Sequence, residues 1–343
     1  MAFTYTTLHN NKQTAQTEMI PGREVEQIIN SASGVSFALD KWKHLERFLI
    51  LGSEGATYYA SAKTLTKKNV GVLTECLKED ALRTVQTIEQ ISVSGRAPKN
   101  DAAIFALAIA STIKEGREAA YVALPHICRT GMHLFQFTAA VEAVRGWGRG
   151  VRRAVGEWYT TKDPQSLAYQ LIKYRQREGW THRDVLRLTH PKVVDPQINN
   201  LLRWVVGKAE GSSHALVDAY LLAQEMTGPK DIVKLLEDVP ALPWEALPTD
   251  ALKHKDVWGA LLPNLPMTAL IRNLGRMTAN GALAPLSDGA RFVQKRLTDE
   301  GALKKARVHP IALLSALRVY SKGVGVKGSL TWTPVSTITD ALE

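Results

Sequence analysis

Residues 163–190 read DPQSLAYQLIKYRQREGWTHRDVLRLTH, and the spacing of the apolar residues in this stretch indicates the fold class. Leu167, Leu171 and Tyr174 recur at intervals of four and three, which is the period of one buried face of a helix. We therefore expect an amphipathic helix over residues 165–177.

The residues around this helix carry the usual start and stop signals. Asp163 before Pro164 supplies an N-cap and a proline at the first helical position. Gly179 indicates a turn after the helix. Thr181 and Asp184 have the spacing of a capping box, so a second helix should begin there and lie beside the first.

The same helical period continues from about residue 39 to residue 320, and the alternation typical of strands is nearly absent. The fold class is therefore all-α. Short helices with tight turns fit either a globular bundle or stacked helix pairs of the HEAT type, and periodicity alone leaves that choice open. The clearest expected helices cover residues 42–51, 70–77, 81–91, 101–113, 133–144, 165–177, 216–226, 267–277 and 310–320.

Other segments depart from this pattern. Residues 1–38 are polar and lack periodicity, which predicts an N-terminal arm. Residues 238–256 are rich in Pro, Leu and Ala and read as a long connector, and residues 323–334 as a loop into one short extended segment. We therefore expect one helical domain over residues 39–334 and a tail over residues 335–343.

Composition narrows the class of partner. In 343 residues, 43 Lys and Arg face 33 Asp and Glu, for a net charge of +10. This balance favours nucleic acid or an anionic membrane surface as the partner, although a basic protein can simply be soluble.

Cys76 and Cys128 lack disulfide or zinc-site spacing, so we expect two reduced core thiols and no metal or cofactor. Without a signal peptide or an apolar span, we expect a soluble, cytoplasmic protein that does not act at a membrane.

The positive charge is concentrated in one part of the chain. Residues 145–192 hold eleven Lys and Arg against four acids, which is seven of the ten net charges. A solvated helix face usually mixes both signs, so this segregation favours a polyanion site.

Helical spacing then suggests which cations act together. Lys173 and Arg177 should project from one face of the first helix, and Arg183, Arg187 and His190 from one face of the second. We expect these five groups to converge on one groove, where arginine can bind phosphate with its planar fork and stack on unpaired bases. The candidate binding residues of this polyanion site are Lys173, Arg175, Arg177, Arg183, Arg187, His190, Arg149, Arg152 and Arg153.

Histidines and aromatic residues near this region have competing interpretations. His190 lies where the second helix must end, and it can contact RNA or simply complement the helix dipole. His182 should face solvent, and His133 should be a capping or interior residue. At helical spacing, aromatic residues are more often core than base-stacking platforms, which applies to Phe135, Phe137, Trp147, Trp158 and Tyr159.

Catalytic patterns are missing from the sequence. No nucleophile with a base and an orienting group, no carboxylate pair and no HExxH motif can be assembled, so we do not expect an enzyme. Two alternatives remain open: a nucleic-acid enzyme such as a HEAT-type DNA glycosylase, and a repeat scaffold for acidic proteins.

Several blocks of this sequence resemble those of one known protein family, in the same order along the chain. The run RFLILGSEGATYY over residues 47–59 closely resembles the opening signature of the TROVE module, the family named for telomerase, Ro and vault proteins. Later blocks resemble the same family in the same order, and the chain looks like a bacterial or phage Ro-type member. These blocks are FALA at 105–108, HLF at 133–135, WGR at 147–149, KYRQR at 173–177, GWTH at 179–182, LRLTH at 186–190, LIRNLGRMTAN at 270–280 and KKARVHP at 304–310.

The resemblance implies a ring of HEAT-like helix pairs. It further implies binding of Y RNA on the outer surface, passage of single-stranded 3′ ends of misfolded non-coding RNA into the central hole, and in bacteria cooperation with an exoribonuclease. Matched residue by residue, the family's RNA-contact motif falls on Lys173, Arg177 and His190.

One feature of the family has no counterpart in this sequence. Ro proteins continue into a von Willebrand factor A-like domain with a DxSxS metal motif, and the sequence reaches Glu343 before any such motif. Because that domain helps to close the family's ring, three interpretations stay open: an open ring, a separately encoded partner domain, or a shortened chain.

Overall fold

A computed structural model describes residues 17–29, 33–52, 62–284, 287–308, 310–311 and 313–314, and nearly all of its regular structure is helical. The described residues form sixteen α-helices. They are α1 (Lys41–Leu51), α2 (Ala62–Glu79), α3 (Ala81–Ser94), α4 (Asp101–Thr112), α5 (Arg117–Ile127), α6 (Gly131–Val144), α7 (Arg149–Thr160), α8 (Pro164–Lys173), α9 (His182–Thr189), α10 (Pro196–Val205), α11 (Ala215–Glu225), α12 (Pro229–Asp238), α13 (Lys255–Leu261), α14 (Met267–Ala279), α15 (Asp288–Leu297) and α16 (Glu300–Lys305).

The remaining regular elements are short. Two antiparallel hairpins pair β1 (Gln27–Ile29) with β2 (Val35–Phe37) and β3 (Gln176–Arg177) with β4 (Trp180–Thr181). Single 3₁₀ turns form η2 (Glu24–Glu26), η3 (Trp244–Ala246), η4 (Ala251–Lys253) and η5 (Leu262–Asn264). The all-α class that the periodicity predicts is therefore confirmed.

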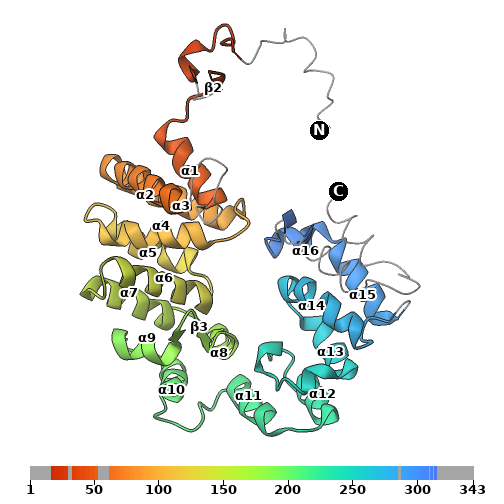
Figure 1. Cartoon of the computed structure of the whole chain (residues 1–343). Coiled ribbons are helices and arrows are strands. Elements are labelled where there is room, and N and C mark those ends of the chain that lie inside the picture. The colour runs from red at the N-terminus through yellow and green to blue at the C-terminus, as the bar shows by residue number, and fades with distance from the viewer. Residues whose placement is uncertain are drawn as a thin grey trace.

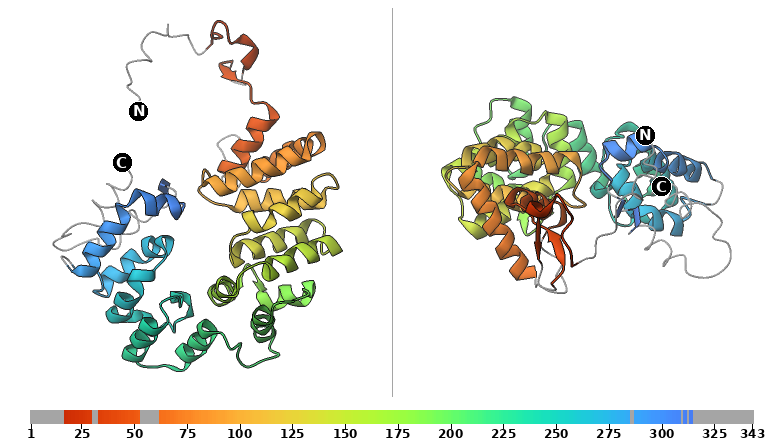
Figure 2. Two further views of the ribbon diagram at one scale, coloured as in Figure 1. Left: turned by 180° about the vertical axis from the view of Figure 1, so that it is seen from behind. Right: turned by 90° about the horizontal axis from the view of Figure 1, so that it is seen from above.

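The helices stack in pairs that wind into an arc. Figure 1 shows successive layers from α1 to α16 following the curve, with the first and last helices facing each other across its opening. The view from behind in Figure 2 shows the same curve, and the view from above sets its two arms side by side. Stacked helix pairs, rather than a globular bundle, are thus the correct alternative of the two that periodicity left open.

The two ends of the arc approach each other closely at Gly95. This residue ends α3 in the left-handed conformation, with φ of 73°. A Cβ atom built on Gly95 would lie 3.5 Å from Cβ of Arg307, which follows α16. The chain therefore brings its own two arms into contact at this point, at a residue where a glycine is favoured by its backbone.

The core runs along the arc between the layers. Helix α4 packs on α3, α5 and α6. Its buried residues lie on all of its faces, as expected of a helix with apolar residues throughout. Phe135, Phe137, Trp158 and Tyr159 are at most 1% exposed, so their interpretation as core is confirmed. Both cysteines are free, buried thiols, as expected.

The predicted helices agree with the structure except at some of their ends. Expected residues 70–77 are only part of the longer α2, and expected residues 165–177 overrun α8. The connector expected at 238–256 is the segment that carries η3 and η4. Most of the helix expected at 310–320, and the segments 323–334 and 335–343, lie outside the described residues.

The described part of the N-terminal arm contains the β1–β2 hairpin, which the sequence pattern did not predict. Figure 1 shows this hairpin projecting away from α1 and the stacked layers. No helix in the described portion of the chain has both the length and the apolar content needed to cross a membrane.

Candidate nucleic-acid interface

The segment with the highest positive charge folds as a helix, a two-residue hairpin loop and a second helix. Asp163 caps α8 by accepting a hydrogen bond from the backbone of Ser166 at 2.8 Å, as predicted. The capping box at the start of α9 is also present, with both Thr181 and Asp184 taking part. These local signals fix where the two helices begin.

The end of α8 differs from the prediction. The helix stops at Lys173, and the chain turns into β3 and β4 around Glu178 and Gly179, whose φ angles are 52° and 77°. Two successive positive φ angles are typical of the type I′ turn that closes a two-residue hairpin. Arg177 therefore lies on a strand, and the expectation that it shares a helix face with Lys173 was wrong.

The hairpin nevertheless brings three of the predicted cations to one place. A hollow of about 540 Å³ lies beside it, and Lys173, Arg175, Arg177 and Glu245 are among the residues that line it. We call this space the hairpin hollow. It holds one carboxylate as well as three cations, which sequence spacing did not indicate.

Lys173 is the least available of these cations. Its side chain is 13% exposed, and its Nζ lies 3.0 Å from the hydroxyl of Tyr169 and 3.8 Å from a carboxylate oxygen of Glu245. Burial acts to lower the pKa of Lys173, but Tyr174, Tyr169 and Glu245 together outweigh it, so the pKa rises. Lys173 is therefore charged but partly compensated by Glu245.

The two arginines of the hollow have different surroundings. Arg175 donates a hydrogen bond to the hydroxyl of Tyr220 on α11, and its guanidinium carbon lies 4.9 Å from the centre of that ring. This contact ties the hairpin to the next part of the arc. Arg177 is exposed, and within the described part of the chain its guanidinium donates only to the carbonyl of Gln176, at 2.6 Å.

The cations of α9 lie outside the lining of the hairpin hollow. Arg187 and His190 are exposed, and His190 ends α9 in the left-handed conformation with φ of 43°. Arg183 reaches toward the loop after α10, where its Nη2 lies 3.9 Å from the Cβ position of Gly207. The five predicted groups therefore do not meet in one groove.

Helix α7 brings further cations beside α9. Its Gly156 packs against the end of α9, since a Cβ there would lie 3.3 Å from Pro191 and 3.7 Å from Thr189. Arg152 lies one turn before Gly156 and is exposed. Because residues one turn apart share a helix face, Arg152 should project on the side where α9 ends.

We call the exposed residues Arg149, Arg152, Arg187 and His190 the α7–α9 patch. Among the described residues, none of the four has a carboxylate within ion-pairing distance. Arg153 differs, because its guanidinium lies 3.8 Å from both Glu118 and Glu157.

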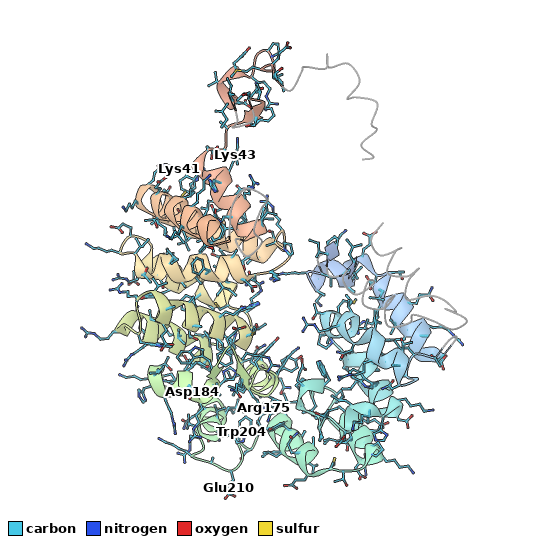
Figure 3. All side chains as sticks on the ribbon, in the orientation of Figure 1. Lys41, Lys43, Arg175, Asp184, Trp204 and Glu210 are labelled. Atoms are coloured by element: carbon cyan, nitrogen blue, oxygen red, sulfur yellow. The ribbon has the colours of Figure 1, made fainter. Side chains whose placement is uncertain are left out.

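The helices that carry the patch lie on a different side of the arc from α8, which leads into the hairpin hollow. Figure 1 places α8 toward the centre of the arc, and α7 and α9 toward its outer side. In Figure 3, Arg175 lies nearer the centre than Asp184, which is on α9. The basic segment thus offers an inner and an outer surface.

His182 is buried, and the expectation that it faces solvent was wrong. Its side chain is 2% exposed, its Nδ1 lies 2.9 Å from the hydroxyl of Tyr159, and its ring centre is 4.7 Å from that of Phe135. Burial lowers the pKa of His182 to about 3, so the imidazole is neutral. This histidine holds the start of α9 in the core and has no part in the surface.

His133 is half-buried on α6, which is nearer to the interior role than to a capping role. Burial, together with the charge of Arg129, lowers the pKa of His133 to about 4. Trp147 is half-buried, with its ring centre 5.8 Å from that of Trp180 in the hairpin. Neither His133 nor Trp147 is an exposed side chain.

Comparison with known proteins identifies the family to which the chain belongs. A model of the TROVE domain matches residues 28–214 and 240–342. The chain belongs to the TROVE domain family. The residues between the two matched segments carry α11 and α12.

Relatives in the TROVE family cover almost the whole chain. It is 37% identical to the RNA-binding protein RO60 of Deinococcus radiodurans over 337 residues, which are 96% of this chain and 62% of that protein. It is 33% identical to the RNA-binding protein RO60 of Caenorhabditis elegans over 402 residues, covering 92% of this chain and 62% of that protein.

A solved TROVE structure has the same fold. The crystal structure of the Deinococcus radiodurans Ro (RSR) protein superposes with a TM-score of 0.68 and 37% identity, covering 88% of this chain and 62% of that one. The family and the fold implied by the resemblance are therefore confirmed. The chain spans about three fifths of the length of these relatives.

Proposed function

We propose that this chain is an RNA-binding protein that holds small structured RNA on the α7–α9 patch and single-stranded RNA at the hairpin hollow. One observation carries the proposal: Arg149, Arg152, Arg187 and His190 are exposed and lack an ion pair to any described carboxylate. Arginines without a partner are hydrated and surrounded by counterions, which a phosphate backbone can displace with a gain in free energy.

The geometry of the two surfaces suits two forms of RNA. An exposed patch rich in arginine can contact the phosphates of a folded RNA, whose bases are paired and hidden. The hairpin hollow on the inner side is concave and offers Arg177 to a flexible strand. Two relatives are named RNA-binding proteins, which supports the same activity for this chain.

The finer parts of the proposal come from the family. We propose that the structured ligand is a Y RNA or a similar small RNA, and that the single strand is the 3′ end of a misfolded non-coding RNA. This would place the chain in RNA quality control or processing, beside an exoribonuclease and a separate von Willebrand factor A-like domain as protein partners.

A mobility-shift titration with two RNAs tests this division. One ligand is a stem-loop with blunt ends, and the other is a single strand of equal length. Changing Arg187 and His190 to Ala should weaken stem-loop binding, whereas Arg177→Ala should weaken binding of the single strand. The proposal fails if the wild-type chain binds neither RNA, or if both variants bind both RNAs as the wild type does.

A further inference from the structure

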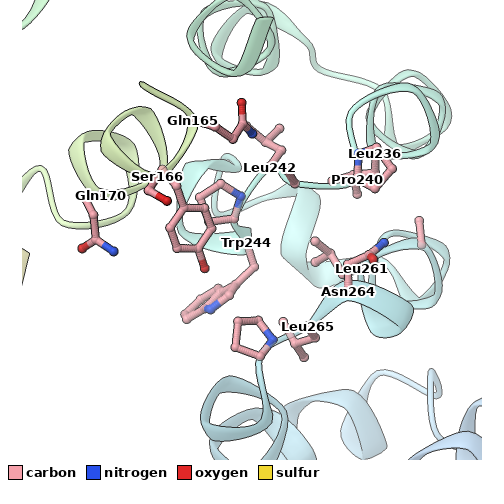
Figure 4. Close-up of a pocket in the computed structure, with 15 residues that line it drawn as sticks. Gln165, Ser166, Gln170, Leu236, Pro240, Leu242, Trp244, Leu261, Asn264 and Leu265 are labelled. Atoms are coloured by element: carbon pink, nitrogen blue, oxygen red, sulfur yellow. The ribbon is translucent and has the colours of Figure 1, made fainter. Parts of the chain in front are cut away.

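A second hollow lies next to the hairpin hollow, on the other side of Tyr169. It has a volume of about 590 Å³ and is bounded by α8 and by the chain between α12 and α14. Figure 4 shows Trp244 standing in it, with Gln165, Ser166 and Gln170 from α8 on one side and Leu261, Asn264 and Leu265 on the other. We call it the Trp244 pocket. Its size is in the range of sites that hold small organic groups.

The lining of this pocket is neutral and partly aromatic. Leu242, Leu261 and Leu265 form an apolar floor and are at most 5% exposed. Tyr169 and Trp244 add two aromatic rings, both half-buried. None of the described residues that line the pocket carries a formal charge. A flat, uncharged group with hydrogen-bonding edges therefore suits the pocket better than an ion.

Hydrogen-bonding groups surround these rings. The side-chain amides of Gln165 and Asn264 are exposed at the pocket and can donate and accept. Gln170 accepts a hydrogen bond from the backbone of Gly131 through its Oε1 at 2.9 Å, which leaves its NH₂ group as a donor. Amide groups of this kind are well suited to the edges of a nucleobase.

Trp244 contributes a donor without an acceptor. Its indole N–H is buried and has no hydrogen-bond partner in the described structure. The neighbouring Trp258 is different, because its indole N–H donates to the carbonyl of Leu252 at 2.8 Å. The two rings are 6.1 Å apart, so Trp258 supports Trp244 from the core side. An acceptor supplied by a ligand would satisfy a donor that is otherwise costly to bury.

The Trp244 pocket shares a wall with the hairpin hollow. Tyr169 lines the pocket, and its hydroxyl receives a hydrogen bond from Nζ of Lys173, which lines the hollow. The neighbouring residues Trp244 and Glu245 also line different spaces: Trp244 lines the pocket, and Glu245 lines the hairpin hollow. A neutral aromatic pocket thus lies beside a cationic hollow, which matches the neutral base and anionic phosphate of a nucleotide.

We infer that the Trp244 pocket takes one unstacked nucleobase of a single-stranded RNA whose adjoining phosphate lies at Arg177 in the hairpin hollow. This inference rests on the proposed RNA binding and names the part of the RNA that the inner surface recognises. The ring of Trp244 stacks on the base, and the side-chain amides of Gln165 and Asn264 bind the edge of the base. A proline-rich peptide would also meet aromatic rings here, but it would leave the neighbouring cations without a counter-charge.

The test compares two single-stranded oligoribonucleotides with the same number of phosphates, one of uridines and one with abasic sites. Wild-type protein should bind the uridine strand about tenfold more tightly, since stacking of a base on an aromatic side chain is worth roughly that factor or more. Trp244→Leu should remove this preference without changing the affinity for the abasic strand. Trp42→Leu removes a half-buried tryptophan from α1, and this control should retain the preference.

The results separate this inference from the proposed function. If the wild type binds neither strand, RNA binding itself fails; if it binds both and Trp244→Leu keeps the full preference, only the base pocket is refuted. Should Trp244→Leu unfold, the exposed pair Gln165→Ala and Asn264→Ala replaces it, and an unchanged preference in that variant overturns the inference. Displacement of the uridine strand by a proline-rich peptide, abolished in Trp244→Leu, would also overturn it.

Discussion

The buried His182 makes the stability of this fold depend on pH. Burial lowers the pKa of His182 from 6.5 to about 3. Since the folded state holds the imidazole neutral while the unfolded chain can protonate it, protons bind preferentially to the unfolded state. The stabilisation is therefore complete above about pH 6.5 and is lost progressively as the pH falls toward 3.

The size of the effect follows from the two pKa values. At pH 5 the unfolded histidine is almost fully protonated and the folded one is not, which costs about 2 kcal/mol of unfolding free energy relative to pH 8. His133 has a pKa lowered to about 4 and adds a loss in the same direction. The contribution of His182 must therefore be isolated with a variant.

Urea unfolding at pH 8 and pH 5 provides the measurement. Between these two pH values the wild type should lose about 2 kcal/mol more than His182→Gln, which cannot titrate. His190→Gln changes an exposed histidine at the other end of α9 and should lose as much as the wild type. Equal losses in the wild type and in His182→Gln would refute the burial of His182 in the folded state.

Three further changes have defined outcomes. Gly131→Ala places a Cβ 2.9 Å from Cβ of Tyr174, so thermal unfolding should show a loss of about 1 to 3 kcal/mol, and an unchanged midpoint would contradict this packing. Arg153→Ala should leave RNA affinity within about twofold, because two carboxylates already compensate this side chain; a large loss in a binding titration would place it in the interface. Glu245→Gln removes the carboxylate beside Lys173 and should strengthen single-strand binding severalfold at low salt, and weaker binding would show that the carboxylate positions Lys173 instead.

Most of the helices could be predicted from the sequence because their signals are local. The spacing of Leu167 and Leu171 places a buried stripe on α8, and Asp163 provides the N-cap that the structure shows. The capping box of Thr181 and Asp184 likewise starts α9 where expected. Such features depend only on residues within one or two turns of each other.

The surroundings of the predicted site residues depend on distant contacts. Glu245 approaches Lys173 from a connector far along the chain, and Tyr220 reaches Arg175 from α11. The burial of His182 likewise depends on Phe135, which lies on a different helix. No local pattern reports such contacts, so charge spacing identified the cations but not which of them are compensated.

Helical periodicity also failed to predict where α8 ends. Glu178 and Gly179 form the loop of a two-residue hairpin, and Trp180 packs against Trp147 from the preceding layer. The tertiary contact and the turn together override the helical pattern that continues through Arg177. Gly179 was the local signal for this turn, because glycine readily adopts the positive φ that a two-residue hairpin loop requires.

The salt dependence of RNA binding tests the central claim most directly. In a titration of a stem-loop RNA at several salt concentrations, changing Arg152 and Arg187 to Ala should reduce the slope of log affinity against log salt by up to about 2, since each arginine neutralises about one phosphate. Lys253→Ala with Lys304→Ala removes the same charge from sites paired with Asp250 and Glu300, and this control should keep the wild-type slope. Equal slopes for the two double variants would contradict the assignment of the α7–α9 patch as the RNA-binding surface.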